Sequence, residues 1–357
     1  MAGKEPVKLA ILDDYASVAS QHFSALQAAH PNLEIQCFPG TLNAKLESEH
    51  AELISRLKPF TIISSMRERT QFPRSVLSQL PQLKLLVTTG MRNAAIDVAA
   101  ATELGITVVG TKGKSNATPG YDATNEQAWT LILGLAKDVV GSAANVTSSA
   151  DGRGWQTGLV SALGGKTLGL LGLGKLGTQA AVTGKLGFGM NVLAWSTSLT
   201  QEKADEAAAS RGLAPGSFKV AASKEDLFRQ ADVLSVHYVL SPRSRGIVAA
   251  KDLALMKSNA ILINTSRGPL IDENDLLEAL EKGKIHGVGL DVFETEPLPK
   301  ESPWRRNQYW GKEGRSLVLV SPHNGYVESE TMNAWYKQQA ETVGTWITGG
   351  EVQNRIQ

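Results

Sequence analysis

The sequence predicts an α/β protein with two doubly wound parallel-sheet domains. Short apolar runs alternate with helical patterns along most of the chain, which is typical of a parallel sheet covered by helices on both faces. The length of 357 residues exceeds that of one average domain. A Gly-rich turn in the second half follows an apolar run and begins a helix, as in dinucleotide-binding units.

The first section contains five short predicted strands and two helical or Ala-rich segments. The strands are expected at 7–12, 33–38, 60–63, 83–88 and 107–109, and the helical segments at 17–29 and 97–103. A stretch rich in Gly, Ser, Asn and Pro then follows at 111–120. Such residues favour loops, so this stretch predicts a connection between domains.

The second section is more clearly punctuated. One long helix is expected over 123–140, before a second Gly-rich interval. Strands are then predicted at 167–171, 190–194, 232–236, 260–264, 286–291 and 317–320, with helices from 175 and over 202–211, 272–281 and 329–347.

Composition excludes several classes of protein. Lys plus Arg is 36 and Asp plus Glu is 35, so the net charge of +1 gives no footprint for nucleic acid or an anionic membrane. The single cysteine, Cys37, excludes an internal disulfide and a multi-thiolate metal site, and no metal is expected. There is no run of 18 apolar residues and no signal-peptide pattern. We therefore expect a cytoplasmic protein without a membrane or nucleic-acid partner.

The Gly-rich turn reads Gly172-x-Gly174-x-x-Gly177. The first glycine permits a tight turn, the second lets the backbone approach a pyrophosphate, and the third allows close packing of helix on strand. The helix that follows begins with Lys175 and Leu176, whose N–H groups would face the phosphates. A glycine-rich turn without a ligand is the alternative.

The next predicted strand ends without the acidic residue that usually holds the adenosine ribose. Ser196, Thr197 and Ser198 stand there instead. A carboxylate would repel a 2′-phosphate and these hydroxyls would not, so the cofactor is expected to be NAD(P)H, leaning towards NADP(H). Lys203 is the nearest cation in the sequence, and a solvated helix residue is its alternative interpretation.

Three further predicted strands are each followed by a residue suited to catalysis. Arg267 lies in INTSRGPL, Glu296 in DVFETEP and His323 in VSPHNG. In an open parallel sheet, ligands bind at the carboxyl ends of the strands. These loops could therefore bring a guanidinium, a carboxylate and an imidazole to one cleft.

Several motifs, in the same order, resemble the D-isomer-specific 2-hydroxyacid dehydrogenase family. The segments that carry the resemblance are GLGKLG, ADVLSVHYVLSPRSRGIV, INTSRGPLIDENDLLEAL, GLDVFETEPLP and SPHNG. The resemblance extends over nearly the whole chain. It implies NAD(P)H-dependent reduction of a 2-keto acid to a D-2-hydroxy acid, and the reverse reaction.

The resemblance also implies roles for individual residues. His323 corresponds to the general acid/base, and Glu296 to the carboxylate that favours its imidazolium form. Arg267 corresponds to the clamp on the substrate carboxylate. The expected cofactor-lining residues are His237, Thr265 and Asp291, with Asp291 near the nicotinamide carboxamide; a purely structural role is the alternative for His237.

The same resemblance implies a Rossmann cofactor domain inserted into a discontinuous flavodoxin-like substrate domain. The substrate domain would contain 1–120 and 326–357, and the NAD(P)-binding domain 121–325. A cleft between them would close on the substrate. Members of the family usually form homodimers through the cofactor domain, and GRGWQ around Trp155 resembles part of that contact.

The expected substrate loop, Gly90-Met91-Arg92, departs from the family pattern. Arg92 replaces a glycine and Ala94 an aspartate. Arg92 could favour a substrate with a second acidic group or several hydroxyls, or could instead form a salt bridge or interdomain contact. Arg67 resembles a position that approaches the substrate in phosphoglycerate enzymes.

An insertion at 304–316 is the second departure, rich in Trp and Arg. It would serve either as a lid over the substrate or as an excursion packed on its own surface.

The fold also allows two other functions. A dinucleotide-sensing corepressor shares the fold but usually has long disordered tails, and formate dehydrogenase carries an amide in place of Glu296.

Overall fold

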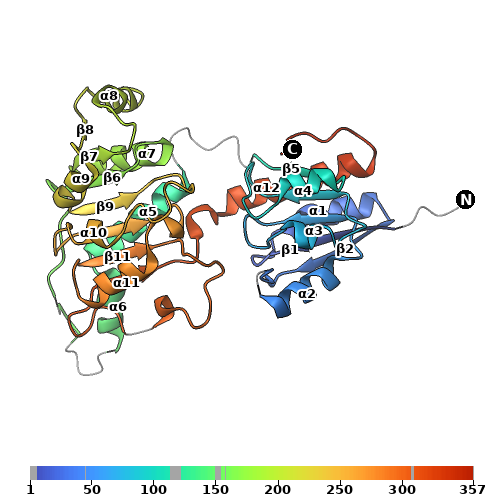
Figure 1. Cartoon of the computed structure of the whole chain (residues 1–357), viewed down its shortest axis with the longest axis horizontal. Helices are drawn as coiled ribbons and strands as arrows, with labels where there is room; N and C mark the ends of the chain where they lie inside the picture. Colours follow the sequence, from blue (N-terminus) through green and yellow to red (C-terminus); the bar gives the residue numbers. More distant parts are fainter. Residues whose placement is uncertain are drawn as a thin grey trace, which may run out of the picture. The chain divides into compact units, whose positions relative to one another are not determined.

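A computed structural model describes residues 6–44, 46–112, 122–148, 154–156, 158–306 and 309–356. The chain divides into two α/β units (Figure 1). The first contains residues 1–117 and 327–357, and the second contains 118–326. These boundaries lie within three residues of the domain boundaries expected from the sequence.

The first unit is built on a five-stranded parallel sheet in the order β2-β1-β3-β4-β5. This is the flavodoxin-like order. Its strands are β1 (Val7–Leu12), β2 (Leu33–Phe38), β3 (Ile62–Ser65), β4 (Leu85–Thr88) and β5 (Thr107–Gly110). Strands β3 and β4 are buried throughout, as expected for parallel strands with helices on both faces.

The helices of the first unit include one from the far end of the chain. They are α1 (Ala19–Ala29), α2 (Glu47–Leu57), α3 (Arg74–Leu77), α4 (Val98–Glu103) and α12 (Ser329–Ile347). Figure 1 shows α12 beside the elements of the N-terminal half. The buried amide of Gln339 bonds the Ser64 hydroxyl and donates to the Ser65 carbonyl oxygen at 3.2 Å. This pairing ties α12 to β3 and explains why the C-terminal helix belongs to the first unit.

The second unit contains a seven-stranded parallel sheet in the order β12-β11-β10-β9-β6-β7-β8. The strands are β6 (Thr167–Leu171), β7 (Asn191–Trp195), β8 (Phe218–Val220), β9 (Val233–Val236), β10 (Ile261–Asn264), β11 (Gly287–Leu290) and β12 (Leu317–Val320). The chain runs outward from β6 through β7 to β8, and then resumes on the other side of β6 with β9. This reversal is that of a Rossmann fold.

Helices surround this second sheet. They are α5 (Ala123–Ala136), α6 (Val139–Ser148), α7 (Lys175–Val182), α8 (Gln201–Ala209), α9 (Lys224–Gln230), α10 (Ala250–Leu253) and α11 (Glu273–Glu281). Short turns of other helix types occur at η1 (Thr183–Gly187), η2 (Gly268–Leu270), η3 (Pro303–Arg305) and η4 (Asn324–Tyr326).

The structure corrects several sequence-based elements. The helix expected over 123–140 is broken at Asp138, which has a φ of +43° and separates α5 from α6. The strand expected at 60–63 runs instead from Ile62 to Ser65. Helices α2, α3, α9 and α10 and strand β8 were not predicted, because they are short or mostly polar and carry a weak apolar pattern.

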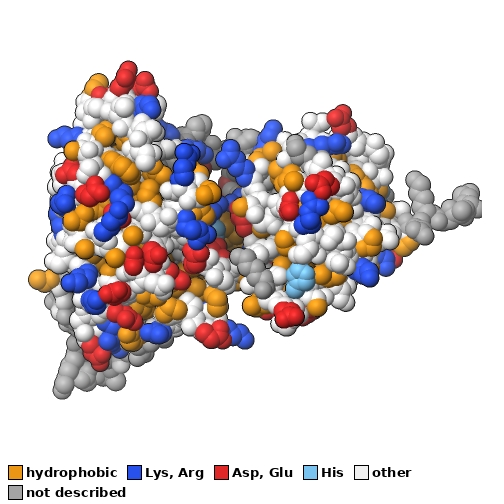
Figure 2. All heavy atoms as spheres, viewed as in Figure 1, with side chains coloured by type: hydrophobic (Ala, Val, Ile, Leu, Met, Phe, Trp, Pro, Cys, Tyr) orange, Lys and Arg blue, Asp and Glu red, His pale blue; other side chains and the backbone are white. Residues whose placement is uncertain are grey.

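Two surface features accompany the fold. Acidic and basic side chains are interspersed on the face shown in Figure 2, consistent with the net charge of +1. None of the helices in the described ranges is both long enough and apolar enough to cross a membrane.

Candidate active site

The carboxyl edge of the second sheet carries nearly all the residues singled out in this unit. The glycine turn follows β6, Ser196 follows β7, and His237 follows β9. Arg267 follows β10, Glu296 follows β11 and His323 follows β12. Because the strand order reverses between β6 and β9, this edge includes the position where open α/β sheets bind their ligands.

The glycine turn has the geometry that its sequence predicts. Gly172 has a φ of +105°, and a Cβ there would lie 2.6 Å from the His237 carbonyl oxygen. A Cβ on Gly177 would lie 2.2 Å from the Gly172 carbonyl oxygen. A Cβ on Gly174 would meet no atom within 4 Å, so the space in front of the helix is open at this residue.

Helix α7 begins directly behind that open space, and Gly174 is its N-cap. No side chain caps its first turn and no acidic residue lies in it. The backbone N–H groups of Lys175 and Leu176 are therefore suited to an anionic pyrophosphate. The Lys175 side chain instead bonds Asp122 at 2.9 Å. Burial alone would raise the pKa of Asp122, but hydrogen bonds from Lys175 and Gln179 outweigh it and lower the pKa.

The end of β7 presents hydroxyl groups. Thr197 bonds the Tyr238 hydroxyl through its Oγ1 at 3.1 Å and donates its N–H at 3.3 Å. Lys203 donates from Nζ to the Ser198 carbonyl oxygen at 2.9 Å, so this cation folds back onto the loop that contains Ser196. The loop therefore combines hydroxyls with one nearby positive charge.

Two buried polar atoms near this edge have no hydrogen-bond partner in the described part of the chain: Nδ1 of His237 and Oγ1 of Thr265. The other ring nitrogen of His237 pairs with Ser235 Oγ at 2.9 Å. Burial lowers the pKa of His237 to about 4, so the imidazole is neutral at pH 7. Unpaired buried groups beside an open glycine turn fit a polar ligand such as a dinucleotide.

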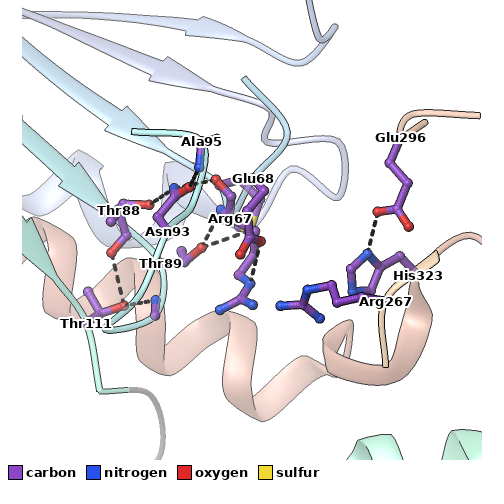
Figure 3. A network of polar contacts seen from close by, with 12 residues as sticks. Arg67, Glu68, Thr88, Thr89, Asn93, Ala95, Thr111, Arg267, Glu296 and His323 are labelled. Carbon is purple, nitrogen blue, oxygen red and sulfur yellow. Dashed lines mark hydrogen bonds and ion pairs between the residues drawn. The ribbon is translucent and has the colours of Figure 1, made fainter. Parts of the chain in front are cut away.

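His323 and Glu296 form a direct pair (Figure 3). The distance from His323 Nδ1 to Glu296 Oε2 is 2.6 Å, and the other Glu296 oxygen accepts the Phe293 N–H at 2.9 Å. Neither side chain is fully buried, because 20% of His323 and 33% of Glu296 is exposed. The Nε2 edge of the imidazole is thus left for another partner.

The loop of His323 is held by Asp291. One oxygen of this buried carboxylate accepts from the Ser321 hydroxyl at 2.6 Å and the Asn324 N–H at 2.7 Å, and the other accepts from the Gly325 N–H at 2.8 Å. Burial raises the pKa of Asp291, although these hydrogen bonds oppose it. His323 itself has a φ of +57°. The carboxylate expected near the nicotinamide thus shapes the loop that presents the imidazole.

Arg267 follows β10 in a turn that packs against the Glu296 loop. The buried Asn264 donates from Nδ2 to the Arg267 carbonyl oxygen at 2.9 Å and accepts the Ser266 N–H at 3.0 Å. A Cβ on Gly268 would lie 2.0 Å from the Phe293 carbonyl carbon. The backbones of the two loops are therefore in direct contact, and Figure 3 shows Arg267 together with His323 and Glu296.

The insertion at 304–316 packs on the second unit itself, in its described residues. Trp304 is 4% exposed, donates its indole N–H to Glu273 at 2.6 Å and stacks on Trp310. Arg305 donates to the carbonyl oxygens of Leu298 and Pro299. Of the two interpretations of this insertion, these contacts favour a segment packed on the surface of its own unit over a lid on the substrate.

The first unit places Arg67 and the 90–92 loop at the carboxyl edge of its own sheet. Arg67 lies in a turn and has a φ of +49°. Its Nη1 lies 2.4 Å from where a Gly90 Cβ would be, and only glycine leaves that space. The Gly90 N–H donates to Thr111 Oγ1 at 3.1 Å.

The next two residues of this loop are open to a ligand. Met91 and Arg92 are exposed, and within the described residues their backbone N–H groups have no protein acceptor. Arg92 forms no ion pair with any described side chain. Two backbone donors and a guanidinium are therefore available to an anion beside Arg67.

The chain is similar to known dehydrogenases and reductases. A family model described as "D-isomer specific 2-hydroxyacid dehydrogenase, NAD binding domain" matches residues 129–325. Glyoxylate reductase of Aeropyrum pernix is 34% identical over 279 residues, which cover 77% of this chain and 76% of the relative. The chain belongs to the D-isomer specific 2-hydroxyacid dehydrogenase family. Its second unit is the NAD-binding domain of that family.

Two further relatives agree with this assignment. D-3-phosphoglycerate dehydrogenase of Methanocaldococcus jannaschii is 32% identical over 305 residues, which cover 85% of this chain but only 53% of the relative. This chain thus matches about half the length of that protein. A crystal structure of phosphoglycerate oxidoreductase from Vibrio cholerae has a TM-score of 0.79 and 32% identity, and the match covers 96% of this chain and 100% of the other.

The family, the fold class and an NAD(P)-dependent oxidoreductase class are thereby confirmed as predicted. The relatives are dehydrogenases and reductases, and they give no support to the corepressor alternative. No group of three or more His, Cys, Asp or Glu side chains in the described ranges is arranged to hold a metal ion.

Sequence reasoning missed three residues that organise the site. They are Asn264 behind Arg267, Asn93 behind Arg67, and Thr111 behind Gly90. Asn264 carried a usable signal, since it is a polar residue at the end of a fully buried strand. Asn93 and Thr111 lie in loops, where such residues are common and carry no signal alone.

Proposed function

We propose that this protein reduces a 2-keto acid to a D-2-hydroxy acid with NAD(P)H, and catalyses the reverse reaction. The observation that carries the proposal is the His323–Glu296 pair at the carboxyl edge of an NAD-binding domain, with Arg267 on the adjacent strand end. A proton donor, a fixed carboxylate and a guanidinium are what the reduction of a keto acid requires.

Each residue has a distinct task in this proposal. The bound nicotinamide supplies the hydride that reduces the carbonyl carbon. His323 donates a proton to the carbonyl oxygen from Nε2, because its Nδ1 is engaged by Glu296. The Glu296 carboxylate stabilises the imidazolium form of the donor. Arg267 binds the substrate carboxylate and stabilises the charge that develops on the oxygen.

The substrate carboxylate would also bind the first unit. The N–H groups of Met91 and Arg92 and the guanidinium of Arg67 lie at one sheet edge, where Gly90 leaves room for the arginine. In this proposal the first unit serves as the substrate domain and the second as the cofactor domain.

We infer a preference for NADPH over NADH. The cofactor would bind with its pyrophosphate at Gly172, Gly174, Lys175, Leu176 and Gly177, and with further contacts to Ser196, Thr197, His237, Thr265 and Asp291. The support lies at the end of β7, where hydroxyls and Lys203 replace an acid. Ser196→Asp would repel a 2′-phosphate, and we expect it to reduce the ratio of kcat/KM for NADPH to that for NADH about tenfold or more.

A homodimer is the expected assembly, formed through the second unit. Helix α6 is largely apolar, yet none of its residues is buried, and Val140 is 61% exposed. Trp155 is 72% exposed and Leu159 is entirely exposed. Exposed apolar residues of this kind are typical of an interaction surface.

The decisive experiment measures NADPH and NADH oxidation with glyoxylate, hydroxypyruvate, pyruvate, phenylpyruvate and 2-ketogluconate. We expect turnover of at least one keto acid, and a decrease of about a hundredfold or more in kcat for His323→Ala. Equal rates in the variant and the natural protein would refute the role of His323. Tight cofactor binding without turnover of any keto acid would refute the proposed reaction.

A further inference from the structure

The buried side chain of Asn93 joins the Arg67 turn to the loop at 90–92 (Figure 3). Its Nδ2 donates to the Arg67 carbonyl oxygen at 2.6 Å and to Thr88 Oγ1 at 2.8 Å. Its Oδ1 accepts the Ala95 N–H at 2.9 Å. Asn93 is only 7% exposed, so water does not substitute for these partners. The Arg67 carbonyl oxygen can only accept a hydrogen bond and the Ala95 N–H can only donate one. These two partners therefore require an amide nitrogen at one end of the side chain and an oxygen at the other.

Arg67 has a backbone conformation that requires such support. Its φ of +49° lies in the left-handed region, which costs an L-residue free energy. Its N–H donates to Thr89 Oγ1 at 2.8 Å, and its carbonyl oxygen accepts from Asn93. Side chains from the loop after β4 therefore hold both backbone polar groups of this residue. A strained residue persists only where its surroundings specify it in this way.

The turn determines where the Arg67 guanidinium lies. Nη1 occupies the space that the missing Cβ of Gly90 leaves open, and Cζ lies 5.9 Å from the ring centre of Trp335. The N–H groups of Met91 and Arg92, which have no acceptor among the described residues, come next in the same loop. A rotation of the Arg67 backbone would therefore move the guanidinium relative to these two donors.

The second unit uses the same arrangement for its own arginine. Asn264 is 1% exposed, donates to the Arg267 carbonyl oxygen and accepts the N–H of Ser266. In each unit a buried asparagine thus holds the carbonyl group of an arginine that follows a strand. The two arginines are the ones assigned to the substrate carboxylate in the proposed function.

We propose that Asn93 is a positioning residue, which fixes the Arg67 guanidinium relative to the backbone donors of the 90–92 loop for binding of the substrate carboxylate. This inference rests on the proposed function, because it assumes that the Arg67 edge binds the keto acid. Asn93 touches no substrate itself. It acts through Arg67, and preorganised donors bind an anion without first having to be ordered.

The test is a double-mutant cycle on the full-length protein. Asn93→Asp keeps the shape and the bond from Ala95 but cannot donate to Arg67, and Asn93→Ala removes all three bonds. We expect either variant to raise KM for the best keto acid about tenfold while kcat stays within about twofold. In an Arg67→Gln background the same substitutions should raise KM less than about twofold further, because the group they position is gone.

Asp97→Ala is the matched control, since it removes a single hydrogen bond, the cap to the Ala100 N–H at 2.9 Å, from the same segment of the chain. It should lower the melting temperature and leave KM unchanged. Binding of oxalate to each variant in the presence of NADPH, measured by calorimetry, gives a readout that does not depend on turnover.

The outcomes separate the inference from the function on which it rests. A natural protein that neither turns over a keto acid nor binds oxalate would refute the proposed function and the inference together. Normal turnover with an unchanged KM in both Asn93 variants would refute the inference alone. An equally large effect of Asn93→Asp with and without Arg67 would show that Asn93 does not act through the arginine.

Discussion

At the scale of single residues, the pairing of His323 with Glu296 explains which imidazole nitrogen is available for chemistry. The Nδ1 edge is bonded to Glu296 at 2.6 Å, so only Nε2 remains for a substrate oxygen. Asp291 holds the loop through three hydrogen bonds, and His323 adopts a φ of +57° within it. The position of the proposed proton donor therefore depends on two carboxylates with different tasks.

Replacing Glu296 with Gln removes the negative charge beside His323 and keeps the shape of the side chain. Glu296→Gln can still bond His323 but does not stabilise a positive imidazole, and we expect kcat at pH 7 to fall about 10–100-fold. Steady-state kinetics with the best keto acid measures this. Glu294→Gln is the control, because Glu294 pairs with Arg245 at the surface and should keep kcat within about twofold. An undiminished kcat in Glu296→Gln would contradict the assignment.

Because His237 is buried, we expect the free energy of unfolding to depend on pH. Burial lowers its pKa from 6.5 to about 4, so between these values the unfolded chain binds a proton that the folded chain does not. The free energy of unfolding should therefore fall as the pH decreases from about 6.5 to about 4, by no more than about 3 kcal/mol from this residue.

Urea unfolding at pH 7 and pH 5 measures this dependence. His237→Asn should show a smaller loss of stability between the two pH values than the natural protein. The exposed His286, replaced by Asn, should leave the loss unchanged. If the two variants behave alike, His237 is not the group responsible.

At the scale of elements, backbone contact holds together the two loops that carry Arg267 and Glu296. The turn η2 after β10 packs so closely on the loop after β11 that only glycine fits at 268. Neighbouring parallel strands bring their carboxyl ends to one edge of the sheet. This arrangement alone does not bring the loops after the strands close enough for side chains to form hydrogen bonds. Because Gly268 has no side chain, the backbone of the Arg267 loop can contact the backbone of the Glu296 loop directly.

Gly268→Ala tests this contact. Its Cβ would lie 2.0 Å from the Phe293 carbonyl carbon, so the Arg267 and Glu296 loops must move apart. We expect a loss of about 2 kcal/mol or more in stability and a fall in kcat/KM. Thermal unfolding and kinetics measure both. Gly187→Ala is the control, because its Cβ meets one atom at 4.0 Å and alanine suits a helical turn. A fully active, stable Gly268→Ala would show that the contact is dispensable.

At the scale of the whole molecule, the exposed apolar surface on α6 remains to be covered. No residue of this helix is buried in the described part of the chain, so packing within the chain contributes little to its stability. The exposed Trp155 and Leu159 extend the same apolar character beyond the helix. In the proposed homodimer, a second copy of the chain buries this surface.

Val140→Asp should convert a dimer to a monomer. A carboxylate at a position now 61% exposed would be buried unpaired in the interface, at a cost that association cannot offset. Sedimentation velocity across a range of protein concentrations measures the change. Leu104→Asp, on the first unit, should remain dimeric. A monomeric natural protein would refute the assembly itself.

Much of the fold was predictable because its signals are local. Apolar runs marked most of the strands, and β6 and β12 begin and end where expected. The break at Asp138 was not predictable, since neither of the two residues between α5 and α6 is Gly or Pro and the left-handed conformation arises at an ordinary residue. The polar helix α2 was also missed, because only two of its residues are buried.

The sequence by itself determined the family, the glycine turn and the identity of the candidate catalytic residues, because each depends on residue types at fixed spacing along the chain. Only the tertiary structure decided which side chains hold them. Asn93 reaches the carbonyl oxygen of Arg67 across 26 residues, and Asp291 reaches Ser321 across 30 and Asn324 across 33. Such hydrogen bonds exist only where the ends of neighbouring strands meet. No periodicity in the chain specifies which polar group at that edge faces which.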